Sequence, residues 1–370
     1  MKSRFLFGVA AFVLILIWAA LPAIGNDTEV ALKGKVHYLD KPDLSLAKKM
    51  DAAYQEFKKS GSGDAYFTGY AFLSRHEIHQ GSHGDESRPY IITVSGDRIK
   101  RKRAYEGKSG ESYTDKDGTE VVGVVFLHKV TEKTPHLADV ELIDLDNSYE
   151  FMDMPIYWLG DAKDEESYSY LTHEFESKDT KLQRNILFII SSHVSSKVYD
   201  FLHRVSLGNY DLKVRENAIF WLGNYKDERS LKDLLEIYRK IDESKLKKQI
   251  IFALQMSDQP EAVKELIRIA KNDEDQKLRK DAIFWLGQKA SEESVKALKD
   301  VVNDSDEDTK VKESAVFAIS QLPIEKSVPM LIDIAKTNKN PKVKKQAIFW
   351  LGQKDSDAAL KFFEEILIKK

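Results

Sequence analysis

Three copies of the hexapeptide AIFWLG, at residues 218–223, 282–287 and 347–352, decide the fold of the C-terminal part of this chain. Degenerate copies accompany them, namely IYWLG at 156–160, LFIIS at 187–191, IFALQ at 251–255 and VFAIS at 316–320. Equivalent residues recur every 31 to 33 positions. A fixed period in this range is typical of stacked helical units, none of which can bury its apolar face alone. We therefore expect an α-solenoid of about seven repeats over residues 151–370.

Each unit extends this motif in the same way. A hydrophobic and a basic residue come first, then an alanine, then Trp-Leu-Gly, as in residues 214–223, 278–287 and 343–352. This pattern resembles the HEAT-like repeats of the phycobilin-lyase type. The Phe-Trp-Leu-Gly motif also resembles that of a group of exported bacterial HEAT-repeat proteins. The resemblance implies helix pairs in which the second helix lines a concave surface.

Local signals mark the ends of these helices. Asp or Asn precedes the motif helices and suits a helical N-terminus; these residues are Asp211, Asp242, Asp275, Asp308 and Asn340. Gly223, Gly287 and Gly352 are expected just past the helix ends, where a left-handed residue costs little.

Composition limits the classes of function. The chain has 370 residues and a formal charge of −3, so bulk charge gives no reason to expect a nucleic-acid partner. Cysteine is absent. This excludes disulfides, thiolate zinc sites, cysteine nucleophiles and a lipid-modified cysteine.

The first 25 residues are typical of an export signal. Lys2 and Arg4 precede an apolar run from Phe5 to Leu21, and small residues flank a plausible cleavage site at Ala23-Ile24-Gly25. The run almost spans a bilayer, so an uncleaved anchor over residues 5–24 is the alternative. In both cases we expect a periplasmic or envelope location, with membrane contact only through an uncleaved segment.

Residues 27–150 predict a small α+β domain. A loose lead-in over 27–44 is followed by an amphipathic helix over Ser45–Ser60. Aromatic and β-branched runs then predict about five antiparallel strands, the first turn between them being Ser95-Gly96-Asp97. The basic run Arg98–Arg103 predicts an exposed edge strand, or a site for an anionic partner.

One aromatic residue recurs at the same position of every motif helix. At 100° per residue it points away from the core face formed by Val214, Ala218, Trp221 and Leu222. Two interpretations stay open, which are packing against the next repeat and an aromatic groove for a peptide or partner helix. The ring positions are Tyr157 and the predicted partner-binding residues Phe188, Phe220, Phe252, Phe284, Phe317 and Phe349. The basic residues Arg215, Lys247, Arg279, Lys312 and Lys344 are expected to pack or pair between repeats.

The segment His76–Glu86 holds three histidines and three acids. His76, His79 and His83 could bind a transition metal if the loop folded around it. The spacing His-Glu-x-His does not meet the His-Glu-x-x-His requirement of a zinc protease. A solvated loop and a metal-binding or pH-sensitive loop are therefore the two interpretations.

The sequence predicts a non-catalytic scaffold that holds a protein or peptide on the concave aromatic face, without a resident cofactor. A first alternative is a metal- or ligand-sensing module that uses the loop 76–86. A second is an enzyme of the HEAT-repeat lyase or hydroxylase type. The hydroxylase resemblance implies several His-Glu pairs that bind iron, whereas the repeats here hold only His173-Glu174.

Overall fold

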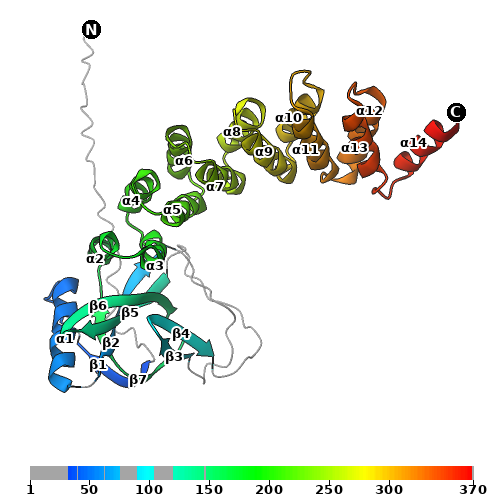
Figure 1. Ribbon diagram of the computed structural model, residues 1–370. Coiled ribbons are helices and arrows are strands. Elements are labelled where there is room, and N and C mark those ends of the chain that lie inside the picture. The colour runs from blue at the N-terminus through cyan, green and yellow to red at the C-terminus, as the bar shows by residue number, and fades with distance from the viewer. Residues whose placement is uncertain are drawn as a thin grey trace, which may run out of the picture.

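The computed structural model describes residues 32–39, 41–61, 63–75, 90–103, 120–145 and 147–368. It is mostly helical, with a barrel-like sheet domain followed by an arc of helix pairs (Figure 1). Within these residues, no helix is both long and apolar enough to cross a membrane. The predicted export signal at residues 1–25 lies outside the described residues.

The sheet has seven strands in the order β4-β3-β7-β2-β5-β6, with β1 paired to β7. Strand β7 lies parallel to β1, β2 and β3, whereas β2–β5, β5–β6 and β3–β4 are antiparallel. The strands are β1 (Leu32–Tyr38), β2 (Ala65–Ser74), β3 (Tyr90–Ser95), β4 (Arg98–Arg103), β5 (Glu120–Thr131), β6 (Thr134–Asp144) and β7 (Tyr149–Asp161).

The sheet curves until its two edge strands meet. The backbone N–H of Ile99 on β4 donates a hydrogen bond of 3.1 Å to Oδ2 of Asp139 on β6. Side chains alternate along β2, so that Phe67 and Ala71 fill the interior while Tyr66, Tyr70 and Phe72 belong to the second core shared with the helices. Because both faces of β2 are covered, its sequence is almost continuously apolar.

Several N-terminal expectations are confirmed. Helix α1 (Leu46–Ser60) forms as predicted and ends at Gly61, which is left-handed with φ of 60°. Strands β3 and β4 form the expected hairpin around Gly96, and β4 is an edge strand of the sheet.

Other N-terminal expectations are wrong. The stretch taken as a loose lead-in contains β1, and the sheet is a mixed, barrel-like sheet of seven strands rather than a small α+β domain with five antiparallel strands. The IYWLG copy at 156–160 lies in β7, where Tyr157 is 1% exposed, so it is a buried strand and no repeat helix. A short aromatic run of this kind is compatible with a helix or a strand. Its pairing with β1 and β2 shows that it is a strand.

The solenoid begins with α2 (Asp164–Glu176), directly after β7. Six helix pairs follow. Their inner helices are α3 (Thr180–Ser191), α5 (Leu212–Asn224), α7 (Ser244–Met256), α9 (Gln276–Lys289), α11 (Thr309–Ser320) and α13 (Pro341–Leu351). Their outer helices are α4 (Lys197–Leu207), α6 (Glu228–Lys240), α8 (Pro260–Asn272), α10 (Glu292–Asn303), α12 (Ile324–Thr337) and α14 (Asp357–Ile368).

Four of the predicted N-caps are confirmed, because the side chains of Asp211, Asp275, Asp308 and Asn340 each accept a hydrogen bond from a backbone N–H of the first turn. For α7 the cap is Glu243 rather than Asp242. Gly223 and Gly287 lie inside α5 and α9 rather than past their ends, which corrects the expectation of left-handed caps. Gly352 does follow α13, although with an ordinary right-handed backbone.

Candidate partner-binding surface

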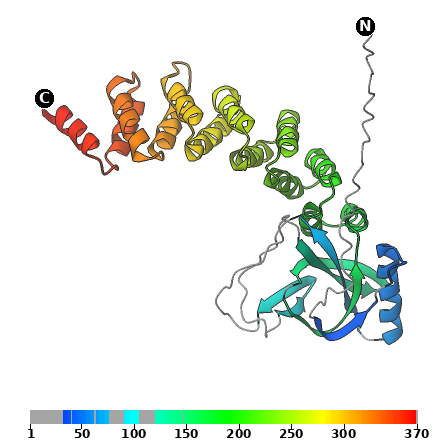
Figure 2. The ribbon, with the colours of Figure 1, turned by 180° about the vertical axis from the view of Figure 1, so that it is seen from behind.

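The inner helices form one continuous row on the concave side of the arc, and the outer helices lie behind them (Figures 1 and 2). Each inner helix carries one phenylalanine of the predicted set. Four of these rings are half-buried, namely Phe188, Phe220, Phe252 and Phe317. Phe284 is 39% exposed and Phe349 is 54% exposed. The six side chains, which we call the aromatic row, are therefore neither core residues nor fully solvated ones.

Tryptophans join these rings in groups of three. Trp221 stacks on Phe188 of the preceding inner helix at 4.9 Å and meets Phe220 edge-on at 4.9 Å. Trp285 contacts Phe252 of the preceding inner helix in a tilted arrangement at 5.3 Å and meets Phe284 edge-on at 4.9 Å. Trp350 contacts Phe317 and Phe349 at 5.2 and 5.0 Å. Ring pairs at such separations are favourable beyond the area that they bury. The packing of rings between repeats is thus confirmed, and part of the ring surface stays exposed. The groove for a peptide or partner helix stays a prediction.

The three tryptophans reveal a period of two repeats. Ala253 and Ala318 occupy the tryptophan position in the intervening helices α7 and α11. A methyl group added at Gly223 would lie 2.5 Å from Cβ of Ala253, and one at Gly287 would lie 2.9 Å from Cβ of Ala318. The methyl group of the alanine therefore packs directly against the glycine of the preceding inner helix, and the two helices lie close together.

A polar side chain stands one helical turn before each ring of the aromatic row. Residues three positions apart share a helix face, so these groups flank the exposed rings. All of them are partly exposed, and four are amides: Asn185, Asn217, Gln249, Asp281, Ser314 and Gln346. An amide can both donate and accept hydrogen bonds, which suits a peptide main chain.

Four of the five basic residues of the repeat motif have partners within the protein. Arg215 pairs with Glu243, and Arg279 pairs with Glu307 at 3.0 Å. The ammonium of Lys247 lies 5.1 Å from the ring centre of Tyr238, and that of Lys344 donates to the Lys336 carbonyl. The expectation that these residues pack or pair between repeats is confirmed for these four.

The aromatic row begins at the junction with the barrel. Phe188 lines a cavity of about 290 Å³ between β4, β6 and α3, together with Asp139, Lys181 and Asn185. The buried Asp139 accepts a hydrogen bond from Nδ2 of Asn185 at 3.0 Å and lies 3.5 Å from the ammonium of Lys181. Nothing in the sequence around Asp139 signals this role, because its three partners are 40 to 46 residues away.

Two histidines, His128 and His193, are buried and hydrogen-bonded. Nε2 of His193 is hydrogen-bonded to Ser167 Oγ at 2.8 Å, and burial lowers the pKa of His193 to about 4. Nε2 of His128 is hydrogen-bonded to Thr68 Oγ1 at 2.8 Å. Burial, assisted by the charges of Lys178 and His136, lowers the pKa of His128 to about 3. Both rings are therefore neutral at pH 7.

The predicted metal ligands His76, His79 and His83 lie outside the described residues. Within the described ranges, no group of three His, Asp or Glu side chains is placed to hold a metal ion. His173 is exposed, and its neighbour Glu174 forms an ion pair with Lys178 at 2.8 Å.

Family models match the central part of the solenoid. A model of HEAT repeats matches residues 239–319 and 263–339, and one of the PBS lyase HEAT-like repeat matches residues 214–239. Residues 214–339 consist of HEAT repeats. Membership of the exported bacterial group with the Phe-Trp-Leu-Gly motif stays a prediction. No curated protein matches the chain significantly.

Three solved structures are similar to part of this chain. Human deoxyhypusine hydroxylase with glycerol is 17% identical, with 54% of this chain and 77% of that chain covered and a TM-score of 0.24. The Escherichia coli protein YibA is 18% identical, with coverage of 56% and 77% and a TM-score of 0.33. The CpcE–CpcF complex of phycocyanin lyase from Nostoc is 14% identical, with coverage of 55% and 93% and a TM-score of 0.32. At these TM-scores none of the three carries an activity over to this chain.

Proposed function

We propose that this HEAT-repeat protein is a non-catalytic scaffold that holds a protein partner along the aromatic row. The observation that supports this most is the exposure of Phe284 and Phe349, at 39% and 54%, on the concave face. An exposed ring forgoes about 1.5–3 kcal/mol of burial energy when it is left in water. A partner that covers these rings would recover the part of that energy that corresponds to their exposed surface.

The surroundings of the rings favour an extended segment as the bound element. Partly exposed amides such as Asn217, Gln249 and Gln346 flank the row and can bond a peptide main chain. Packed helices lie about 8–10 Å apart, so rings two repeats apart are separated by about 16–20 Å. An extended chain covers that distance in about five or six residues. We therefore expect apolar side chains at this spacing in the partner.

The proposed location of the scaffold rests on the sequence alone. A periplasmic or envelope location depends on residues 1–25, as does a possible membrane anchor at residues 5–24. The alternative of a metal-sensing module depends on His76, His79 and His83 and stays a prediction. The enzyme alternative would be supported by bound iron that is lost when His173 is replaced.

The experiment compares partner capture by three forms of the chain. The parent, a Phe284→Ser/Phe349→Ser variant and an Ile324→Ser/Leu360→Ser variant are immobilised and exposed to extract of the cells of origin. Ile324 and Leu360 are exposed apolar residues of α12 and α14 outside the row, so they control for lost surface hydrophobicity. We expect one partner to be retained by the parent and the control variant and lost by the phenylalanine variant. Equal retention by all three folded forms would refute the aromatic row as the binding site.

A further inference from the structure

A row of lysines runs beside the aromatic row. Each phenylalanine of the aromatic row is preceded by a lysine seven residues earlier in the same inner helix. Seven residues are close to two helical turns, so each lysine faces the same way as its ring and stands about 10 Å nearer the start of the helix. We call these six side chains the lysine row, which consists of Lys181, Lys213, Lys245, Lys277, Lys310 and Lys342. All except the half-buried Lys181 are exposed.

Contacts in the structure place the two rows on one surface. Lys181 and Phe188 line the same cavity beside the barrel, with Asn185 between them in the sequence. The ammonium of Lys245 lies 2.7 Å from Oε1 of Glu216 on the preceding inner helix. The lysines therefore lie over the same side of neighbouring inner helices, on the concave face of the arc (Figures 1 and 2).

Positive charge is concentrated on the inner helices. They carry 16 lysines and arginines against 3 aspartates and glutamates, whereas the outer helices carry 14 of each kind. The formal charge of −3 for the whole chain conceals this difference. The concave face is therefore basic although the protein as a whole is not.

Helix stability does not account for the lysine row. The first turn of a helix favours acidic side chains and disfavours basic ones, because the N-terminus carries partial positive charge. All six outer helices follow this rule and have an acid in the first turn. The six inner helices have none there. Each of them has a lysine as its second residue instead.

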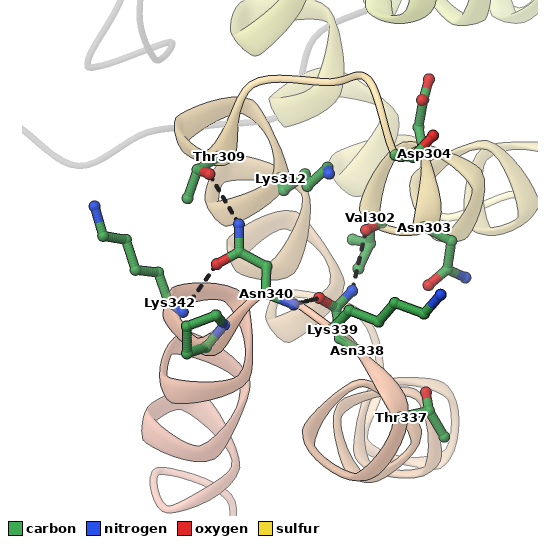
Figure 3. Close-up of a pocket in the computed structure, with 12 residues that line it drawn as sticks. Val302, Asn303, Asp304, Thr309, Lys312, Thr337, Asn338, Lys339, Asn340 and Lys342 are labelled. Carbon is green, nitrogen blue, oxygen red and sulfur yellow. Dashed lines mark hydrogen bonds between the residues drawn. The ribbon is translucent and has the colours of Figure 1, made fainter.

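Most of these lysines lack a counter-charge within the protein. Among the described residues, Lys181 pairs with Asp139 and Lys245 pairs with Glu216, while the other four lysines form no ion pair. Figure 3 shows one of these four, Lys342, at the start of α13, on the opposite side of the pocket from Asp304. The lysine row is thus available to an acidic partner.

We propose that the aromatic row and the lysine row together bind an extended segment of a partner protein in which apolar and acidic side chains alternate. This inference rests on the proposed function and adds the chemistry of the partner. Successive side chains of an extended chain point to opposite sides, so that one set reaches the rings and the other set reaches the lysines. Polar side chains such as Asn217 and Gln249 stand between the two rows and can bond the main chain of the segment.

The rings favour a protein over a single-stranded nucleic acid. Bases bind such surfaces by stacking on open aromatic faces. Three of the six rings already contact a tryptophan of the next repeat with a tryptophan, namely Phe188, Phe252 and Phe317. A partner that contributes apolar side chains needs only the ring surface that is left exposed.

The first experiment measures the binding of fluorescently labelled ten-residue peptides to the purified chain by fluorescence anisotropy. The probe is a peptide of alternating leucine and glutamate. Two comparison peptides have serine in place of leucine, or lysine in place of glutamate. We expect the leucine–glutamate peptide to bind the parent most tightly, with an affinity that falls as the salt concentration rises.

Two double variants locate the bound peptide. Lys277→Gln/Lys310→Gln removes two charges of the lysine row and is expected to weaken binding of the leucine–glutamate peptide about tenfold at low salt, through the loss of ion pairs. Lys232→Gln/Lys296→Gln removes two exposed lysines of α6 and α10 and is expected to leave the affinity unchanged. Circular dichroism checks that both variants are folded.

Three peptide results would overturn the proposal. They are an absence of binding of the leucine–glutamate peptide, equal affinity of the two double variants for it, and equally tight binding of the leucine–lysine peptide. Tighter binding of oligothymidine that depends on Lys277 and Lys310 would also overturn it and would assign the surface to nucleic acid.

Capture of the cellular partner separates this inference from the proposed function. The partner could be retained by Lys277→Gln/Lys310→Gln and lost by Phe284→Ser/Phe349→Ser. The aromatic row would then remain the binding site, and the acidic segment would be excluded.

Discussion

Nδ2 of Asn185 on the first inner helix donates a hydrogen bond of 3.0 Å to Oδ1 of Asp139 on β6. The other oxygen of this carboxylate accepts the backbone N–H of Ile99 on β4 at 3.1 Å. One buried side chain therefore connects two edge strands of the barrel with the start of the solenoid. The two parts of the molecule are expected to depend on each other for stability.

Replacement of Asp139 by alanine tests this dependence. We expect the free energy of unfolding to fall by about 2–4 kcal/mol, because a buried N–H group and the Asn185 amide lose their acceptor. Urea denaturation followed by circular dichroism measures the change. Asp97→Ala removes a surface ion pair with Lys129 and serves as the control, with little expected effect. A parent-like midpoint for Asp139→Ala would contradict the assigned role.

The close approach of α5 and α7 predicts a cost for a single methyl group. Gly223→Ala would place Cβ 2.5 Å from Cβ of Ala253, so one helix has to shift. We expect a loss of about 1–3 kcal/mol in unfolding free energy, as for other overpacked cores. Gly352→Ala is the control, because its nearest contact is 3.4 Å and its φ is −66°. If both variants had equal stability, close packing at Gly223 would be disproved.

The buried histidines predict acid sensitivity. The pKa of His193 is about 4 in the folded protein, below its ordinary value of 6.5. As the pH falls, the histidine therefore takes up a proton in the unfolded chain before it does so in the folded protein. The free energy of unfolding decreases between about pH 6.5 and pH 4, by up to about 1.4 kcal/mol per pH unit for each such histidine. The pKa of about 3 for His128 extends this loss to lower pH.

Denaturation at pH 7, 6 and 5 measures this effect. His193→Gln is expected to be less stable than the parent at pH 7 and to lose less stability between pH 6 and pH 5. His173→Gln replaces an exposed histidine and should keep the slope of the parent. If the stability of His193→Gln fell as steeply with pH as that of the parent, His193 would be excluded as the source of the acid sensitivity.

The tryptophans are expected to matter more for stability than the exposed phenylalanines. Trp285→Ala removes ring contacts to Phe252 of one repeat and Phe284 of the next. We expect a loss of about 2–4 kcal/mol, because large-to-small changes at packed positions leave a cavity. Phe349→Ala is expected to cost less, since more than half of its ring surface is already in water. Thermal unfolding of both variants measures these losses of stability. A larger loss of stability for Phe349→Ala than for Trp285→Ala would contradict the packing described.

The solenoid could be predicted because its signals are local and repeated. The helix positions and four N-caps follow from residues that lie within a few positions of one another, such as Asp211 and Lys213. The same motif misled at residues 156–160, where Tyr157 and Trp158 pair with strands more than 80 residues away. Five residues alone cannot show whether a buried segment is a strand or a helix.

The candidate site could be predicted only in its outline. The period in the sequence predicted that the six phenylalanines recur on equivalent helices, but it did not predict the pairing of each tryptophan with a ring of the preceding repeat. Their role in partner binding stays a prediction. Likewise, the basic residue of each unit was visible, whereas its partner was not, because Glu243 and Glu307 lie 28 residues after Arg215 and Arg279. Such differences depend on contacts between repeats, which a single repeat does not contain.

Gly223 packs against Ala253, and Gly287 packs against Ala318. These contacts limit which repeats can be deleted from or inserted into such a chain. Deleting the pair α7–α8 would bring the glycine of α5 against Trp285, a side chain for which that narrow contact has no room. Deleting α7 to α10 together would bring Gly223 against Ala318 and restore the fit. The module that can be gained or lost is therefore four helices long, so viable shorter or longer forms should differ by two repeats at a time.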